Sequence, residues 1–372
     1  MQLSVIILNY NVRYFLEQCV LSVQKALEHI DGEIIVIDNA SSDDSCEMMK
    51  TKFPQIKLIE NKDNLGFPKG NNIGVAQANG EYICILNPDT VVAEDTFSKI
   101  LNTKNWQLNT GIIGCKLIDG AGNFLPESKR GVPTPWVAFT KIFGLYKISN
   151  YFGKYYAQHL SENESGKVDI LVGAFMVMKR ELYLEVGGFD ENCFMYSDDI
   201  DLSYLVLKTG KSNYYFHETS VIHYKGESTV RDGTYIKRFR EAMQFFYKKH
   251  FKKSWFFDVM MQVGSFVFSL LKKNQQKNEV RTIDEYVVFS KENLELNLSK
   301  KATYLSDFNQ FVNQPQKNLE IIFDTTTFSF AEIITFMQLN KSKNLSFKNY
   351  ISSSNYLIGS NNSNDRGQII LL

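Results

Sequence analysis

The sequence predicts an α/β protein with a Rossmann-like, mostly parallel sheet. Apolar runs at residues 3–8, 33–38 and 82–86 are separated by segments with helical spacing or turn residues. Continuous apolar runs are typical of parallel strands that are buried on both faces. Strands that alternate with helices along the chain are joined by crossover connections, which place helices on both faces of one sheet.

The segments between these runs are expected to be helical. Residues 14–28 carry apolar positions at helical spacing, and the polar stretch 39–45 offers several N-caps to a helix that ends near Phe53. A further strand at 56–60 leads into a glycine-containing loop and another helix. Because ligands of such sheets bind beyond the carboxyl ends of the strands, polar residues at those ends are the first candidates for a site.

The chain is long enough for about two domains, and its pattern divides into three parts. We expect residues 1–250 to form one α/β domain, followed by an apolar helix and a polar linker at 251–280. Residues 281–372 contain several strand candidates and one helix candidate at 330–339. This pattern predicts a small α/β appendage of unknown role at the C-terminal end.

The composition is that of a globular protein and excludes some functions. Of the 372 residues, 44% are hydrophobic and 22% are charged, and 41 basic residues balance 41 acidic ones. A chain without net charge has no electrostatic footprint for nucleic acid. The five cysteines form no CxxC or Cys/His cluster, which is typical of buried thiols in a reducing compartment. The N-terminal residues lack the order of a signal peptide, so we expect a cytoplasmic protein.

Residues 254–273 form an apolar segment with lysines on both sides. The run is short for a membrane span and contains Asp258. A helix that lies in the headgroup region, with its basic flanks near anionic lipid, fits this pattern, whereas a core helix packed on the rest of the chain is the alternative. We therefore expect peripheral contact with the inner face of the plasma membrane.

Three polar residues end or follow predicted strands: Asn9, Asp38 and Asp89. A carboxylate at the tip of a buried strand, such as Asp38, is suited to accept a hydrogen bond from the base or ribose of a nucleotide. A helix cap is the alternative role, although Ser41 and Ser42 already offer caps. The loop after the first strand lacks both the GxGxxG of a dinucleotide site and the glycine-rich basic loop of a nucleotidyltransferase.

The stretch NPDT at residues 87–90 offers a metal ligand. Asp89 can present a hard oxygen to Mg²⁺ or Mn²⁺, which take their other ligands from phosphate and water. A plain turn is the alternative for this stretch. His223 in HYKGES could add a nitrogen ligand, with Lys225 near the phosphates, or could be a structural histidine.

The stretch MYSDDIDL crowds Asp198, Asp199 and Asp201 at the start of a predicted helix. Partial positive charge at a helix N-terminus lowers the cost of this crowding, but a cap needs only one aspartate. Paired acids can tune each other's pKa, which suits a base that takes a proton from a hydroxyl group. Asp198 and Asp199 are therefore candidates for a base and its tuning partner, and Asp201 is expected to hold the helix start.

These stretches belong to a set of motifs that runs through residues 1–250. The set resembles the inverting glycosyltransferases of family two, which have a GT-A fold. It is most similar to the bacterial, rhamnosyltransferase-like enzymes of cell-surface polysaccharide synthesis. The residues beyond about Val280 fall outside the resemblance. In chain order the motifs are SVIILNYN, VIDNASSDDS, NLGFPKGNNIG, LNPDT, GAFMVMKR, GGFDE with MYSDDIDL, and HYKGEST.

The resemblance implies roles for individual residues. Asp199 matches the general base of the family's acid pair, and Asp198 takes the place of its glutamate partner. Asp89 matches the last aspartate of the DxD metal motif, whose first position is Asn87 here, and His223 matches the late histidine near the diphosphate. The expected donor-binding residues are Leu8, Asn9, Asp38, Asn64, Gly66, Asn72 and Asn87. The expected acceptor-binding residues are Gly173 and Ala174.

The implied reaction moves a sugar from a nucleotide-diphosphate sugar donor to a hydroxyl of a glycan acceptor, with a lipid-linked glycan as the expected acceptor. One displacement inverts the anomeric centre, and Mg²⁺ or Mn²⁺ is the expected cofactor. A sugar nucleotidyltransferase and a non-catalytic nucleotide-sugar-binding protein are the alternatives.

Overall fold

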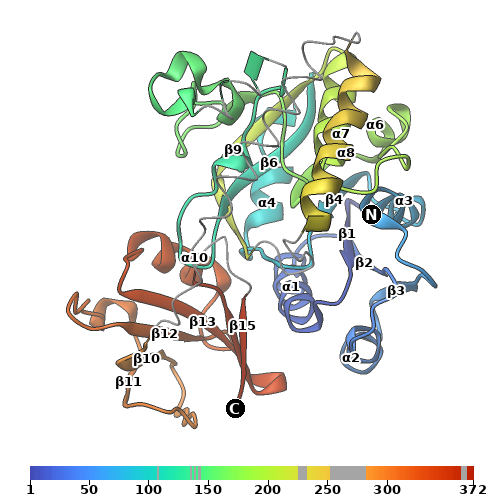
Figure 1. Cartoon of the computed structure of the whole chain (residues 1–372). Helices are drawn as coiled ribbons and strands as arrows, with labels where there is room; N and C mark the ends of the chain where they lie inside the picture. Colours follow the sequence, from blue (N-terminus) through green and yellow to red (C-terminus); the bar gives the residue numbers. More distant parts are fainter. Residues whose placement is uncertain are drawn as a thin grey trace.

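The computed structural model describes residues 1–106, 109–134, 136–137, 140, 144–224, 233–251, 282–361 and 367–372. These residues form a nine-stranded sheet and a separate six-stranded sheet, which lie one above the other in Figure 1. None of the helices in the described ranges is long and apolar enough to cross a membrane. Some of the sequence-based expectations concern residues outside the described ranges. These are the membrane-surface helix at 254–273, most of the linker at 251–280, and Lys225.

The first half of the large sheet is parallel, as the sequence predicts. Its order is β3-β2-β1-β4, and each neighbouring pair is parallel. The register places Asn9 opposite Asp38, so both side chains arise at the carboxyl edge of the sheet. The four strands are β1 (Leu3–Asn9), β2 (Gly32–Asp38), β3 (Lys57–Glu60) and β4 (Tyr82–Leu86).

Helices cover both faces of this half because alternate side chains of a strand point to opposite sides. Val5 and Ile7 pack with Leu16 in one hydrophobic cluster, whereas Ile6 packs with Val75 in another. Figure 1 shows the helices that follow the first three strands grouped around this half of the sheet. They are α1 (Arg13–Ala26), α2 (Ser45–Lys52) and α3 (Gly66–Ala76).

The second half of the large sheet is mixed. Strand β8 lies antiparallel between β4 and β6, and β9 is parallel to β6, while the short strands β5 and β7 pair antiparallel with β9. Strands β6 and β9 therefore share the direction of β1 to β4, which confirms the predicted α/β fold with a mostly parallel sheet. The bounds are β5 (Thr90–Val91), β6 (Thr110–Ile118), β7 (Gly166–Val168), β8 (Phe175–Lys179) and β9 (Ser212–His223).

Strand β9 has 12 residues and continues through an irregularity in its pairing. Its pairing with β6 shifts between Cys115, which faces Phe216, and Lys116, which faces Ser220. Such an irregularity increases local twist and lets a long strand continue. The remaining helices of this part are α4 (Thr96–Leu101), α6 (Arg180–Glu185), α7 (Asp198–Lys208) and α8 (Gly233–His250), with short 3₁₀ turns at Lys104–Trp106, Pro126–Ser128, Leu145–Lys147 and Asn150–Tyr156.

The six-stranded sheet belongs to the described residues after 281, which we call the C-terminal unit. Its order is β11-β10-β12-β13-β14-β15, parallel up to β13 and antiparallel beyond it. Helix α10 begins with a capping box in which Ser329 and Glu332 satisfy each other's backbone N–H groups. The elements are β10 (Glu285–Phe289), β11 (Ala302–Leu305), β12 (Leu319–Asp324), α10 (Phe330–Leu339), β13 (Leu345–Ile351), β14 (Tyr356–Gly359) and β15 (Gln368–Leu371), with 3₁₀ turns at Phe308–Gln310 and Ser352–Ser354.

Candidate active site

Buried polar side chains lie together at the carboxyl ends of β1 and β2. Asn9 Nδ2 donates a hydrogen bond to Asp38 Oδ1 at 2.7 Å, and the Ser41 N–H donates to Asp38 Oδ2 at 2.8 Å. Asp38 is only 2% exposed. The carboxylate therefore shapes the loop after β2 and does not cap α2, whose N-cap is Asp44. Asn9 Oδ1 is buried without a hydrogen-bond partner among the described residues, which leaves an acceptor for a ligand donor or a water molecule.

The loop before α3 is held close to these strand ends by amide side chains. Asn39 Nδ2 donates to Asn64 Oδ1 at 3.0 Å and to the Gly66 carbonyl at 3.2 Å. Gly66 has a φ of +81°, and an added Cβ would lie 2.8 Å from both the ring and the carbonyl oxygen of Phe194. Glycine is therefore required by conformation and by space. Leu8 of β1 fills the room that Gly70 leaves on the same helix.

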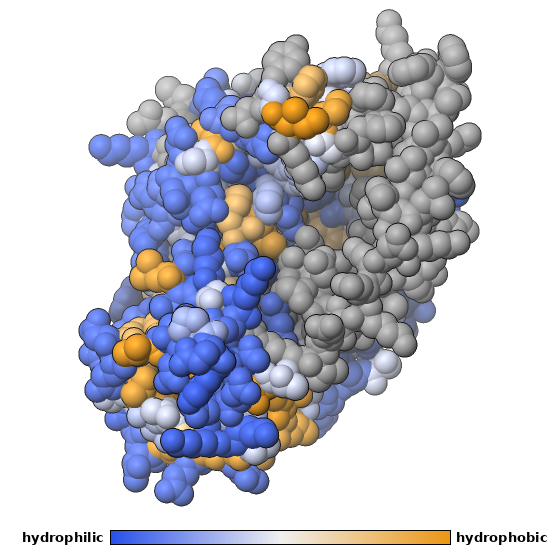
Figure 2. Space-filling model, turned by 60° about the vertical axis from the view of Figure 1, so that its left-hand side comes forward, coloured by the Kyte–Doolittle hydropathy of each residue, from blue (hydrophilic) through white to orange (hydrophobic). Residues whose placement is uncertain are grey.

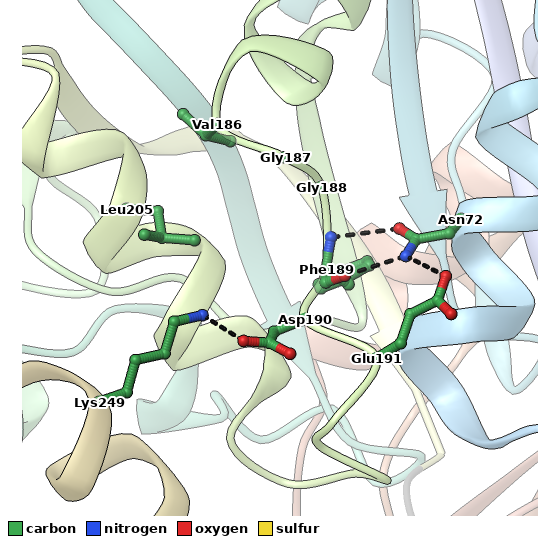
Figure 3. Close-up of a pocket in the computed structure, with 9 residues that line it drawn as sticks. All are labelled: Asn72, Val186, Gly187, Gly188, Phe189, Asp190, Glu191, Leu205 and Lys249. Carbon is green, nitrogen blue, oxygen red and sulfur yellow. Dashed lines mark hydrogen bonds and ion pairs between the residues drawn. The ribbon is translucent and has the colours of Figure 1, made fainter.

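Asn72 of α3 hydrogen-bonds α6 and the loop that follows it. Its Nδ2 donates to the Phe189 carbonyl at 2.9 Å and to Glu191 Oε1 at 3.0 Å, and its Oδ1 accepts from Tyr183 Oη and the Phe189 N–H. Figure 3 shows this amide anchoring the loop beyond α6 at the edge of a cavity of about 490 Å³. The structure thus engages both ends of the Asn72 amide with side-chain and backbone groups of the protein.

The NPDT stretch meets the end of β9. Asp89 Oδ1 lies 3.4 Å from His223 Nε2, and Asn87 Nδ2 lies 3.5 Å from the same nitrogen. Asp89 and His223 are both buried, and the pairing of Thr90 with His223 in the β5–β9 ladder fixes their approach. The sequence-predicted metal ligands therefore lie side by side, although they are far apart in the chain.

The donor set at this point fits a divalent cation that is shared with a ligand. Among the described residues, no group of three or more His, Cys, Asp or Glu side chains could hold a metal ion alone. Asp89 supplies one hard oxygen and His223 one nitrogen, and the His223 Nδ1 atom is buried without a partner in the described part of the chain. Mg²⁺ and Mn²⁺ keep few protein ligands when phosphate oxygens and water complete the shell.

The acid pair at the start of α7 is buried beside Gly173. The Gly173 N–H donates to Asp199 Oδ2 at 3.1 Å, and Arg130 Nη2 lies 2.5 Å from the same oxygen. Burial and the neighbouring charge of Asp199 raise the pKa of Asp198 to about 7. Two neighbouring buried carboxylates do not both ionise easily. Arg130 gives Asp199 a positive partner, whereas the pKa of Asp198 is raised.

The acid pair and the NPDT stretch are linked through β8. The Asn87 N–H donates to the Ala174 carbonyl at 3.0 Å, one residue after the Gly173 N–H that binds Asp199. An added Cβ on Gly173 would lie 3.3 Å from Asp199 Cβ, so the glycine lets the acid approach the strand. The structure therefore brings the expected base, the acceptor wall and the metal motif to one edge of the sheet.

Asp201 has a different role from the one expected. Its Oδ2 lies 2.8 Å from Lys249 Nζ, and its Oδ1 lies 2.5 Å from His250 Nε2. Lys249 also contacts Asp190 at 2.6 Å, a contact drawn in Figure 3. Asp201 is fully enclosed, and its oxygens contact the end of α8. It therefore joins helices α7 and α8, whereas the sequence suggested that it holds the helix start.

Arg130 is the main site residue that sequence reasoning missed. Its backbone pairs with Ile170, its Nη2 also donates to the Leu171 carbonyl at 3.1 Å, and its guanidinium is nine-tenths buried. Although burial favours the neutral form, the neighbouring Asp199 raises the pKa of Arg130. Arg130 lies in a loop without periodic pattern, and no motif in the sequence marks it.

Comparison with known proteins gives the family to which this fold and this site belong. The model of glycosyl transferase family 2 matches residues 4–187. An N-acetylglucosaminyl-diphospho-decaprenol L-rhamnosyltransferase of Mycobacterium tuberculosis is 25% identical over 241 residues, which cover 62% of this chain and 78% of that protein. A rhamnosyltransferase of Escherichia coli is 30% identical over 172 residues, which cover 43% of this chain and 61% of that protein.

The chain belongs to glycosyl transferase family 2 and is a glycosyltransferase. The family resemblance seen in the motifs is confirmed. A solved mannosyltransferase from Pyrobaculum calidifontis, in complex with GDP-Man and Mn²⁺, is 16% identical and superposes with a TM-score of 0.48, covering 74% of this chain and 76% of that chain.

Proposed function

We propose that this glycosyltransferase moves a sugar from a nucleotide-diphosphate sugar to a hydroxyl of a lipid-linked glycan, with inversion, in cell-surface polysaccharide synthesis. The observation that carries the chemistry is the buried pair Asp198 and Asp199, which adjoins the Asn87–Asp89 stretch through Gly173 and Ala174. The choice of acceptor is supported by the name of the mycobacterial relative, which acts on a diphospho-decaprenol-linked sugar.

Asp199 acts as the general base in this proposal. An ionised carboxylate is needed to take the acceptor proton, and Arg130 places a positive charge beside the Asp199 carboxylate. Within the described part of the chain, the hydrogen bonds to the Asp199 side chain from Arg130 and Gly173 both go to Oδ2, and in this proposal Oδ1 receives the acceptor hydroxyl. As that oxygen forms its bond to the anomeric carbon, its proton passes to Asp199 and the bond to the diphosphate oxygen breaks.

In this proposal the donor lies next to Leu8, and Asn72 holds the neighbouring loop. The other residues on the donor side are Asn9, Asp38, Asn64, Gly66 and Asn87. Asp89 and His223 would hold the cation, Mg²⁺ or Mn²⁺. When bound, the cation offsets the negative charge that grows on the leaving nucleoside diphosphate. Gly173 and Ala174 form the acceptor wall.

A lipid-linked acceptor places the reaction at a membrane surface. We therefore propose that the protein works on the cytoplasmic face of the plasma membrane, in peripheral contact with it. The apolar and basic segment at 254–273 is the candidate for that contact because its sequence joins an apolar run to lysine flanks.

A panel of nucleotide sugars tests the proposal. Release of nucleoside diphosphate is measured with and without a lipid-linked glycan acceptor, in Mn²⁺ and in chelator. We expect one donor to support acceptor-dependent release, and chelator to reduce it. Donor binding without any release would favour the non-catalytic alternative. Formation of a nucleotide sugar from a nucleoside triphosphate and a sugar phosphate would favour the nucleotidyltransferase alternative.

A further inference from the structure

The strand that follows the expected metal ligand Asp89 is too short to keep its own geometry. Strand β5 has two residues, Thr90 and Val91, and it is the last strand in the order of the large sheet. Its ladder partner is the end of β9, which carries His223. A strand of two residues makes few ladder hydrogen bonds of its own, so this β5–β9 ribbon at the edge of the sheet gains stability from another element that packs on it.

The C-terminal unit covers the side of the ribbon opposite to His223. Ile222 and Tyr224 flank His223, and both side chains belong to the hydrophobic cluster that contains Phe289 and Ile333 of the C-terminal unit. Because side chains alternate along an extended chain, His223 lies on the other side, toward Asp89. The apolar contact therefore fixes the ribbon from behind.

Tyr224 connects this cluster directly to the metal motif. Its backbone N–H donates to the Asp89 carbonyl at 3.0 Å, and its ring packs edge-on against Phe15 at 5.2 Å between centroids. Its hydroxyl accepts a long hydrogen bond of 3.4 Å from Asn349 Nδ2 of β13. One residue thus contacts Asp89 through its backbone and the C-terminal unit through its side chain.

Glu94, three residues after β5, makes the second connection. Its Oε1 accepts from the Phe330 N–H at 2.8 Å, and its Oε2 accepts from the Ala331 N–H at 2.9 Å. These are N–H groups of the first turn of α10, which have no partner within the helix. A carboxylate is also the charge that a helix N-terminus favours. The chain segment after Asp89 is therefore tied to α10.

The C-terminal unit directs its apolar side toward the large sheet. Gln338 Nε2 donates to Ser220 Oγ of β9 at 3.0 Å, and Lys25 Nζ donates to the Thr325 carbonyl at 2.7 Å, so polar contacts surround the shared cluster. In Figure 2, the lower part of the molecule, where Figure 1 shows this unit, presents a mainly hydrophilic surface with small, separate apolar areas. Within the described residues, the unit thus shares a hydrophobic cluster with the sheet that carries the site.

We propose that the C-terminal unit positions the donor side of the active site, with Glu94 and Tyr224 as the positioning residues that keep Asp89 and His223 at their mutual distance. This inference rests on the proposed function, in which Asp89 and His223 serve the donor diphosphate and its cation. It assigns a catalytic consequence to Tyr224 and the C-terminal unit, which lie beyond the residues 4–187 that the family model matches.

A pair of glutamate variants tests this inference. Glu94→Ala and Glu332→Ala each remove a carboxylate from the N-terminus of α10, but Glu332 bonds only Ser329 within the C-terminal unit. Both variants are expected to lower the melting temperature. Only Glu94→Ala is expected to raise the donor KM and weaken Mn²⁺ binding, by about tenfold each, because small misplacement of ligands is costly. The donor is the best one of the panel, and Mn²⁺ is titrated by electron paramagnetic resonance in the presence of the product diphosphate.

The acceptor KM separates positioning from general loss of structure. It is expected to stay within about twofold of wild type in both variants, and Glu94→Gln, which keeps one accepting oxygen, should recover part of the donor affinity. Equal donor KM and equal Mn²⁺ affinity in Glu94→Ala and Glu332→Ala would overturn the inference. A wild-type protein that releases no nucleoside diphosphate from any donor would instead overturn the proposed function.

Discussion

Arg130 and Asp199 form a buried ion pair, with Arg130 Nη2 2.5 Å from Asp199 Oδ2, although 69 positions separate them in the chain. The pair sets the charge distribution at the start of α7. Asp199 has a positive partner, and Asp198 has a negative neighbour and a raised pKa. Two adjacent aspartates thus have different electrostatic surroundings, which is a common way to separate a base from its partner.

Replacing Arg130 should affect stability and transfer together. Arg130→Gln leaves Asp199 buried without a counter-charge, and breaking a buried pair from one side costs about 3–5 kcal/mol. We expect a lower free energy of unfolding by urea denaturation and a reduced kcat. Lys129→Gln is the matched control, since Lys129 Nζ binds the carbonyls of Tyr156, Ala157 and Leu160 and does not contact the acids. An unchanged kcat in Arg130→Gln would contradict a role in orienting the base.

Asp199→Asn should abolish transfer while donor binding persists. An amide of the same shape cannot accept the proton, and loss of general base catalysis costs about 10²- to 10⁴-fold. Calorimetry with the donor and a transfer assay measure the two effects separately. Wild-type turnover in this variant would exclude Asp199 as the base.

Asp198→Asn should keep most of the transfer activity and change the pH dependence of stability. The unfolded chain releases the Asp198 proton near pH 4, whereas the folded protein releases it near pH 7. Between these values the folded state binds more protons, so the free energy of unfolding falls as pH rises from about 4 to about 7. The variant should show a flatter profile in urea titrations. A transfer loss as large as that of Asp199→Asn would assign the base to Asp198.

Gly66→Ala should destabilise the protein more than Gly187→Ala. Both glycines have positive φ, +81° and +86°, so both variants pay for backbone strain. An added Cβ at Gly66 also meets Phe194, whereas nothing lies within 4 Å at Gly187. We expect a larger loss of melting temperature and a higher donor KM for Gly66→Ala. Equal effects in the two variants would mean that the contact with Phe194 contributes little.

The sequence predicts the first half of the large sheet well because buried parallel strands are continuous apolar runs. The strand at Tyr82–Leu86 and the helix at Phe330–Leu339 have the expected bounds. Strand β13 (Leu345–Ile351) lacks a continuous apolar run because it contains Lys348 and Asn349, which are nevertheless buried. Lys348 is enclosed with Glu320 at 3.8 Å, a long-range pairing that leaves no local pattern.

The candidate site residues that lie at strand ends could be predicted from the sequence. Asn9, Asp38 and Asp89 all lie at the carboxyl edge, as parallel topology requires. Arg130 could not be predicted because an arginine in an irregular loop has many possible partners until the fold selects one. Asn72 illustrates the opposite case. Its motif predicts a donor-binding residue, but its amide hydrogen-bonds the loop beyond α6.

The contact between Gly66 and Phe194 has a consequence for engineering. The Phe67 N–H also donates to the Phe194 carbonyl at 3.0 Å, so the segment that begins α3 and the segment that leads into the acid pair are joined by backbone and side chain. A chimera that imports residues 190–197 from another family member would place a foreign side chain over Gly66. Such a graft should therefore carry residues 64–67 with it, as one exchangeable module.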